Sequence, residues 1–81
     1  MKPIQVPVDE IYVPVKLARA LDEAKVQTVA DSFIDEGKMI PVRVRHDGER
    51  YVLVQGVHRL AACKALGEPT ITAYLVQAMQ H

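Results

Sequence analysis

A short run near the middle of the chain brings together residue types that can hold an anion. Gly56, His58 and Arg59 follow a stretch rich in β-branched residues, and an apolar helical pattern begins at the same place. Glycine lets a ligand approach the backbone, and the first turn of a helix leaves N–H groups unpaired beside partial positive charge. Arginine adds several hydrogen-bond donors in a fixed planar arrangement. Histidine adds a donor whose protonation depends on its surroundings. The run therefore indicates a phosphate-binding corner, although a solvated bend is the commoner reason for so short a motif.

A second group of polar residues falls on the helix that we predict to begin with Asp22 as its N-cap. Lys25, Thr28 and Ser32 are spaced three and four residues apart, so they line one side of this helix. A cation with two hydroxyls would suit a polyphosphate, whereas a solvated helix face is the more common reason for the pattern. The core-facing stripe of the same helix comprises Val26, Val29, Ala30, Phe33 and Ile34.

The remaining pattern predicts an α+β fold, with a small mixed sheet and two main helices packed on it. The expected strands cover residues 3–8, 40–46, 50–54 and 70–76, and the expected helices cover 22–36 and 58–66. Asp47-Gly48 is a strong signal for a hairpin turn between the two middle strands. Residues 9–14 suggest a turn or a single helical turn, and residues 15–20 are expected to be irregular.

Composition restricts the classes of function. A chain of 81 residues can bury one modest core, and its ten basic residues balance its ten acidic ones. DNA binding by this domain alone is therefore disfavoured, because nucleic-acid binders usually carry a basic footprint. The single Cys63 excludes an internal disulfide and a multi-cysteine metal site. No apolar run approaches the ~20 residues of a membrane span, and no signal peptide is evident, so we expect a cytoplasmic protein.

Taken in order along the chain, these motifs resemble sulfiredoxins. The run Leu21-Asp-Glu-Ala-Lys-Val-Gln-Thr-Val-Ala-Asp-Ser32 is similar to the first-helix signature of that family. The run Gly56-Val-His-Arg-Leu-Ala-Ala62 resembles its Gly-Cys-His-Arg corner. The similarity covers about residues 3–79 as one domain. The pattern Gly56-x-x-Arg59 also fits the N-terminal domains of ParB-type chromosome-partition proteins, which belong to the same superfamily.

The resemblance implies a nucleotide-binding site. ATP lies across this corner in sulfiredoxins, and Mg²⁺ would arrive with the nucleotide rather than sit in a preformed protein cage. Carried over residue by residue, the nucleotide contacts would be Lys25, Thr28 and Ser32 from the helix, and Gly56, His58 and Arg59 from the corner.

The same comparison puts Val57 where sulfiredoxins carry their catalytic cysteine. That thiol serves an ATP-dependent oxidoreductase reaction on the sulfinic acid of an over-oxidised peroxiredoxin, and valine has no sulfur to replace it. Cys63 lies six residues later, about 9 Å further along the helix axis, where it suits packing better than catalysis. We therefore expect nucleotide binding without the standard sulfinic-acid reductase activity, and no catalytic residue is assigned. Phosphotransfer or nucleotide hydrolysis stays open, because positioning and electrostatics supply most phosphoryl-transfer catalysis.

Two further functions stay open. A ParB-like module linked to DNA partition or transcriptional regulation would use the same corner for a nucleotide, but we see neither the helix-turn-helix nor the dimerisation segment that ParB proteins add. In the other alternative, the domain binds a protein partner, peroxiredoxin-like or not, and the corner is a structural relic.

Overall fold

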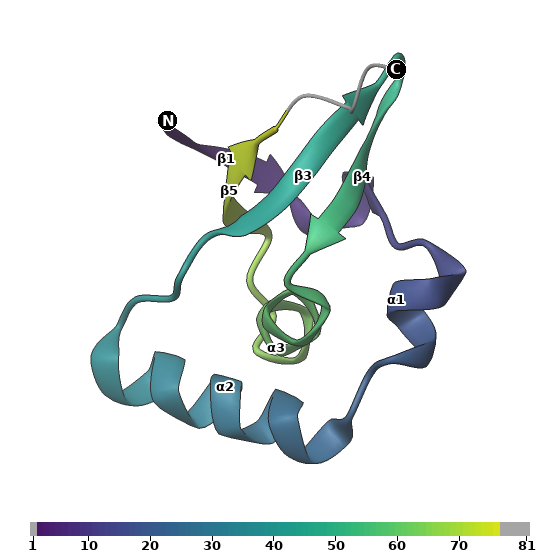
Figure 1. The fold of residues 1–81 in the computed structure, drawn as a ribbon. Helices are drawn as coiled ribbons and strands as arrows, with labels where there is room; N and C mark the ends of the chain where they lie inside the picture. The colour runs from purple at the N-terminus through teal and green to yellow at the C-terminus, as the bar shows by residue number, and fades with distance from the viewer. Residues whose placement is uncertain (1, 77–81) are drawn as a thin grey trace.

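The computed structural model describes residues 2–76, which form a five-stranded mixed sheet with helices on one side (Figure 1). The strand order is β1-β5-β3-β4-β2, and α3 lies between α2 and the sheet. None of the described helices is long and apolar enough to cross a membrane. In chain order the elements are β1 (Pro3–Pro7), the 3-10 turn η1 (Val8–Glu10), β2 (Ile11–Tyr12), α1 (Val15–Arg19), α2 (Glu23–Glu36), β3 (Val42–Asp47), β4 (Arg50–Gln55), α3 (Val57–Ala65) and β5 (Thr70–Leu75).

The main core lies between the sheet and α3. Val42 and Val44 alternate on β3 toward the helix side, where they meet Leu60 and Cys63 of α3. The second helix, α2, does not complete this core but packs on the outer side of α3. Small side chains make that approach possible, because Ala30 of α2 and the fully buried Ala62 of α3 belong to one cluster.

A β-bulge near the end of β4 decides which way the chain leaves the sheet. Val44 pairs with Leu53, but Arg43 pairs with Gln55, so Val54 is an extra residue in β4. Residues paired across a ladder share a face of the sheet, and a bulge re-aims the residues that follow it. Gln55 therefore shares the face of Arg43 instead of the core face of Leu53, and the chain turns into α3 immediately afterwards.

The α+β class and the mixed sheet are confirmed, and both predicted main helices are present as α2 and α3. The predicted hairpin is confirmed as β3 and β4, and the outer strands as β1 and β5. Residues 77–79 of the predicted domain lie outside the described residues.

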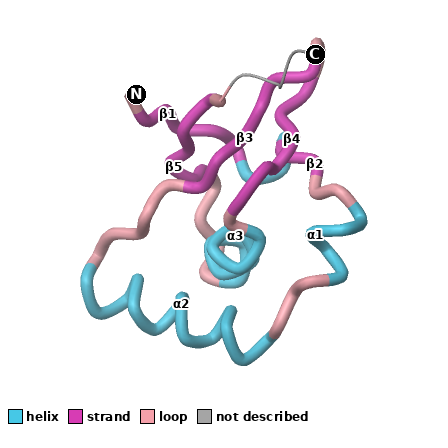
Figure 2. Tube along the Cα trace, viewed as in Figure 1, coloured by secondary structure: helices cyan, strands magenta, loops and turns pink. Residues whose placement is uncertain are grey.

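Three local predictions were wrong or incomplete. The stretch predicted to be irregular forms α1. The predicted turn at residues 9–14 overlaps the end of η1, which is a single helical turn, and also contains the two-residue strand β2. Figure 2 shows α1 as a short helix after β2. Because α1 has no buried residue, it lacks the apolar stripe by which a helix is found in sequence. Ile34 belongs to the predicted stripe but is 66% exposed, since α2 crosses α3 and its C-terminal end passes beyond that shorter helix (Figure 1).

Candidate functional site

Gly56 forms the corner between β4 and α3, and no larger residue fits there. Its φ of 110° and ψ of 33° lie in the left-handed region that favours glycine. A Cβ atom at this position would lie 2.6 Å from Cγ1 of Val42, which is fully buried and cannot move away easily. The Gly56 carbonyl accepts a hydrogen bond from the Leu60 N–H at 2.9 Å, so α3 begins directly at the corner. Within the described chain no side chain caps this helix, which leaves the N–H groups of its first turn for a ligand.

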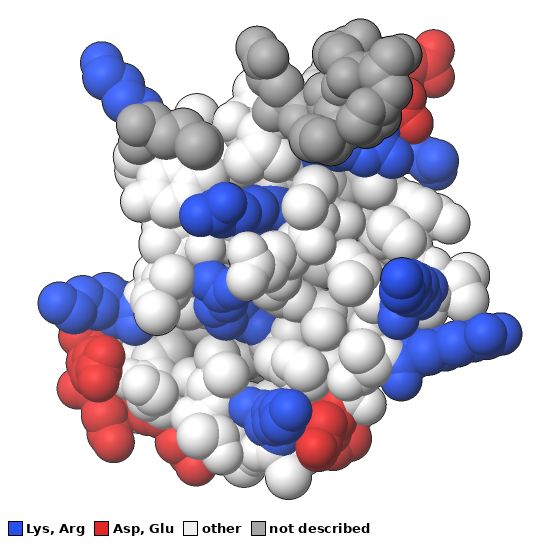
Figure 3. Space-filling model, in the orientation of Figure 1, with Lys and Arg blue, Asp and Glu red and all other residues white. Residues whose placement is uncertain are grey.

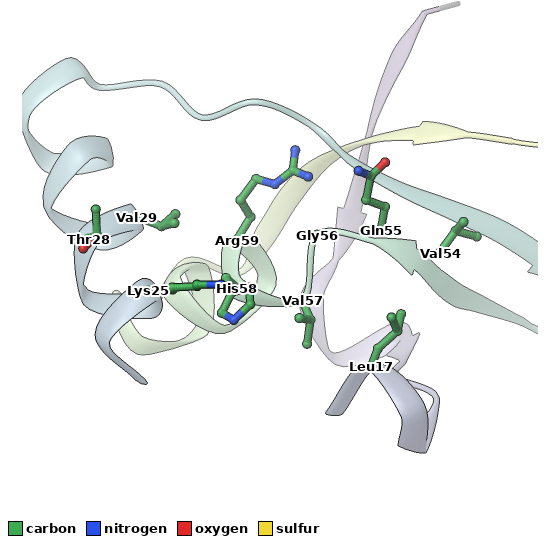
Figure 4. A pocket seen from close by; sticks show the side chains of 10 residues that line it. All are labelled: Leu17, Lys25, Thr28, Val29, Val54, Gln55, Gly56, Val57, His58 and Arg59. Carbon is green, nitrogen blue, oxygen red and sulfur yellow. The ribbon is translucent and has the colours of Figure 1, made fainter. Parts of the chain in front are cut away.

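A cavity of about 530 Å³ opens at this corner (Figure 4). Small-molecule sites usually measure roughly 300 to 1,000 Å³, so a nucleotide-sized ligand is within range. Five of the six predicted contact residues line this cavity, whereas Ser32, one turn further along α2 than Thr28, does not. The complete lining is Leu17, Lys25, Thr28, Val29, Val54, Gln55, Gly56, Val57, His58 and Arg59.

Arg59 braces the linker between α2 and β3 at the edge of the cavity. Its Nη1 donates hydrogen bonds to the carbonyl oxygens of Ile40 at 3.1 Å and Pro41 at 2.7 Å. Both bonds use one nitrogen, so the rest of the guanidinium fork can still serve an anion. Burial lowers the pKa of Arg59, and the nearby charge of Arg43 lowers it further. The side chain remains a cation at neutral pH, because an arginine pKa starts far above that range.

His58 ties the start of α3 to the start of α2. Its Nε2 accepts a hydrogen bond from the backbone N–H of Asp22 at 3.0 Å, which leaves Nδ1 as the ring nitrogen that can donate in this arrangement. Asp22 in turn caps α2, since its carboxylate accepts the Ala24 N–H at 2.9 Å. His58 is therefore a positioning residue for the two helices, with Nδ1–H as its remaining donor.

The α2 wall contributes one cation and one hydroxyl. Figure 4 shows the Lys25 side chain reaching from α2 toward His58. Thr28 donates its hydroxyl proton to the Ala24 carbonyl at 3.1 Å, so its Oγ1 can only accept from a ligand in this arrangement. Among residues 2–76 no carboxylate lies within ion-pair distance of Lys25 or Arg59. Within the described chain, neither cation at the cavity is therefore held in an ion pair with a carboxylate.

Charge is unevenly distributed over the molecule. On the face seen in Figure 3, Lys and Arg side chains are spread through the middle, while Asp and Glu gather mainly along the lower rim over α2. Within the described residues there is no group of three or more His, Cys, Asp or Glu side chains suited to hold a metal ion. The arrangement favours an anion and offers no protein cage for a cation.

The sulfur of Cys63 is separated from the cavity. This side chain is 3% exposed, and its Sγ lies 3.9 Å from Sδ of Met39 in the core. Burial raises the pKa of the Cys63 thiol, and the charge of Glu68 raises it further, so the thiol stays protonated at neutral pH. The residue at the first position of α3 is Val57, which lines the cavity and packs against the main core. Cys63 is therefore a packing residue, as the sequence pattern indicated.

Sequence reasoning missed four lining residues, which are Leu17, Val29, Val54 and Gln55. Val29 was assigned to the core-facing stripe, and Leu17 lies on the helix that no pattern predicted. Val54 and Gln55 line the cavity because of the bulge in β4, and a bulge does not require particular residue types that a sequence would reveal. Only the position of Gln55 directly before Gly56 could have pointed to the site.

Residues 2–81 match the family described as the ParB N-terminal domain. The chain belongs to that family. It is also similar to the chloroplastic/mitochondrial sulfiredoxin of Arabidopsis thaliana, with 32% identity over 68 residues, or 84% of this chain. That alignment covers 54% of the sulfiredoxin, so this ParB N-terminal domain protein spans about half the length of the curated relative. The predicted membership of the ParB/sulfiredoxin superfamily is confirmed.

Solved structures support the same fold. The crystal structure of sulfiredoxin from Arabidopsis thaliana has a TM-score of 0.84 and 28% identity, covering 96% of this chain and 88% of that one. C-terminally truncated ParB from Caulobacter crescentus, complexed with CTP-γ-S, has a TM-score of 0.80 and 19% identity over 99% of this chain and 47% of that one. A free serine kinase variant in complex with ADP has a TM-score of 0.82 and 16% identity, covering 94% of this chain and 31% of that one. The last two likenesses concern the fold alone.

Proposed function

We propose that this domain binds a nucleoside triphosphate, with ATP as the first candidate, in the cavity at the start of α3. The observation that carries the proposal is the convergence of Lys25 from α2 and Arg59 from α3 on one cavity with an uncapped helix N-terminus. Within the described chain neither cation has a carboxylate partner, so a phosphate would supply the missing negative charge.

The polar and apolar parts of the lining suit the two ends of a nucleotide. The phosphates would lie at Gly56, where the backbone is open and the helix dipole is positive. Leu17, Val54 and Val57 supply apolar surface for the nucleoside. Mg²⁺ would be carried by the phosphates, since the positive lining suits the anion and not a bare metal ion. Ser32 stays a predicted contact that would require a ligand extending along α2.

We further propose that the domain does not perform standard sulfinic-acid repair of a peroxiredoxin. That reaction needs a thiol at the first position of α3, and Val57 has no group that can attack sulfur. Cys63 is the only thiol in the chain, and it is buried against Met39 rather than open to the cavity. The proposed activity is therefore binding, or phosphate chemistry at the nucleotide, without sulfur chemistry.

A nucleotide screen by thermal unfolding tests the proposal. A ligand at a hundred times its Kd adds about 2.7 kcal/mol of stability, which raises the Tm of a domain this small by more than about 10 °C. We expect such a rise with millimolar ATP, a clearly smaller rise for Lys25→Ala, and a wild-type rise for Lys64→Ala. Lys64→Ala is the matched control, because it removes the same charge from the last turn of α3, away from the cavity lining. The absence of any rise with all four common triphosphates would overturn the proposal.

The second candidate is a CTP-binding module of ParB type. Two observations favour it: the family match over residues 2–81 and the fold shared with a ParB protein that binds CTP-γ-S. The same screen separates the candidates, since a rise with CTP well above that with ATP would favour the ParB type. DNA binding that weakens steeply with added salt would support it further.

A further inference from the structure

Arg43 lies beside the cavity, although no sequence motif pointed to it. It is an exposed residue of β3, and it pairs across the ladder with Gln55, which lines the cavity. The bulge in β4 puts these two residues on the same face of the sheet. After burial, the charge of Arg43 is the second cause that lowers the pKa of Arg59.

Three elements bring cations to the cavity or its edge, and we call these three residues the cluster: Lys25 and Arg59 line the cavity, and Arg43 pairs with the lining residue Gln55. Among the residues that the structure describes, the recorded ion pair is Arg45 with Asp47 at 4.0 Å, and no member of the cluster has a carboxylate at such a distance. The formal net charge of the chain is zero, so the cluster does not follow from a basic composition. Neighbouring like charges repel each other, and an anion with several charges removes that repulsion.

We propose that Arg43 contacts the distal phosphate of the bound nucleotide and makes the site prefer a triphosphate to the corresponding monophosphate. The inference rests on the proposed function, because it concerns the ligand of the same cavity. Arg43 is not part of the cavity lining but lies beyond Gln55. It therefore meets only the part of a ligand that extends out of the cavity, past the phosphate held at the start of α3. A monophosphate ends before it reaches this side chain.

Titration calorimetry with AMP, ADP and ATP tests this role, with magnesium omitted so that no metal shares the phosphate charge. For Arg43→Gln, we expect ATP affinity to fall roughly five- to tenfold, because a charge-assisted contact is lost. AMP affinity should change less than about twofold, since AMP does not reach the side chain. Arg45→Gln is the matched control, because it removes the same charge two residues along β3. It should leave the ratio of ATP to AMP affinity at the wild-type value.

Each other result overturns the inference in a recognisable way. Equal losses of AMP and ATP affinity in Arg43→Gln would mean that Arg43 only adds to the positive electrostatic potential of the site and does not contact the distal phosphate. An unchanged ATP affinity, or the same loss in Arg45→Gln, would mean that there is no specific contact. Wild-type protein that binds none of the three nucleotides would overturn the proposed function itself. Arg43 is exposed, and its side chain forms no hydrogen bond with the other residues that the structure describes, so the Tm of the free variant should match the wild type and exclude misfolding as the cause.

Discussion

Besides the α2 wall, the cavity has two walls that are built in different ways. The wall formed by β4 and α3 belongs to the core, since Gly56 packs against Val42 and Leu60 in the same helix is 2% exposed. The opposite wall is α1, a five-residue helix without a buried residue, which contributes the half-buried Leu17. The corner where we propose the phosphates to lie is thus part of the core, whereas the proposed apolar end depends on α1, which buries no residue and contacts the core through the half-buried Leu17.

The largest expected effect is at the corner of the core wall. Gly56→Ala should lower the free energy of unfolding by roughly 3 kcal/mol, because it adds backbone strain to an overlap with the buried Val42. Urea denaturation measures the loss. Gly48→Ala is the control, since Gly48 also has a positive φ but a Cβ there meets nothing within 4 Å. Its loss should be only about 1 kcal/mol, from strain alone. Equal losses would mean that packing against β3 does not fix the corner.

An intermediate effect is expected where the core wall meets the linker before β3. Arg59→Lys keeps the charge, but the shorter lysine side chain does not reach as far as Nη1, which bonds the carbonyl oxygens of Ile40 and Pro41. The free energy of unfolding should fall by about 1.5 kcal/mol, and ATP affinity by roughly tenfold. Denaturation and calorimetry on the same variant measure both. A variant with wild-type stability and weakened binding would show that Arg59 serves only the ligand.

A change in the α1 wall should affect ligand binding more than the stability of the fold. Leu17→Ala should lower the free energy of unfolding by about 1 kcal/mol or less, since this side chain is only half-buried. We expect ATP affinity to fall about threefold through lost apolar contact, as measured by calorimetry. Leu21→Ala is the control, because it makes the same truncation at a leucine that is 38% exposed and does not line the cavity. Equal changes in affinity for the two variants would remove α1 from the site.

The same contrast explains what could be predicted from the sequence. Gly56, His58 and Arg59 were found because a glycine corner with polar neighbours at a helix start leaves a clear signal in residue types. Leu17 could not be found, because a short exposed helix lacks periodicity and its contact with the cavity is tertiary. Arg43 pairs with Gln55 because of a bulge, and a bulge changes strand pairing without requiring a particular residue type. Local backbone chemistry was thus predictable, and the placement of Lys25 and Thr28 beside the corner followed from the family resemblance. The contributions of α1 and of the bulge were not predictable.

The smallest effect concerns the pH dependence of the core wall. Burial raises the pKa of Cys63, so the folded state keeps the thiol proton to higher pH than the unfolded chain does. The resulting stability is fully present below the unfolded-state pKa of about 8.5 and is lost as pH rises toward the folded-state value. The loss cannot exceed about 1.4 kcal/mol per pH unit for one proton. Between pH 7 and pH 9.5, the free energy of unfolding of wild type should therefore fall more steeply than that of Cys63→Ala. Parallel curves would mean that the thiol ionises as readily in the folded protein as in the unfolded chain, which contradicts its burial beside Met39.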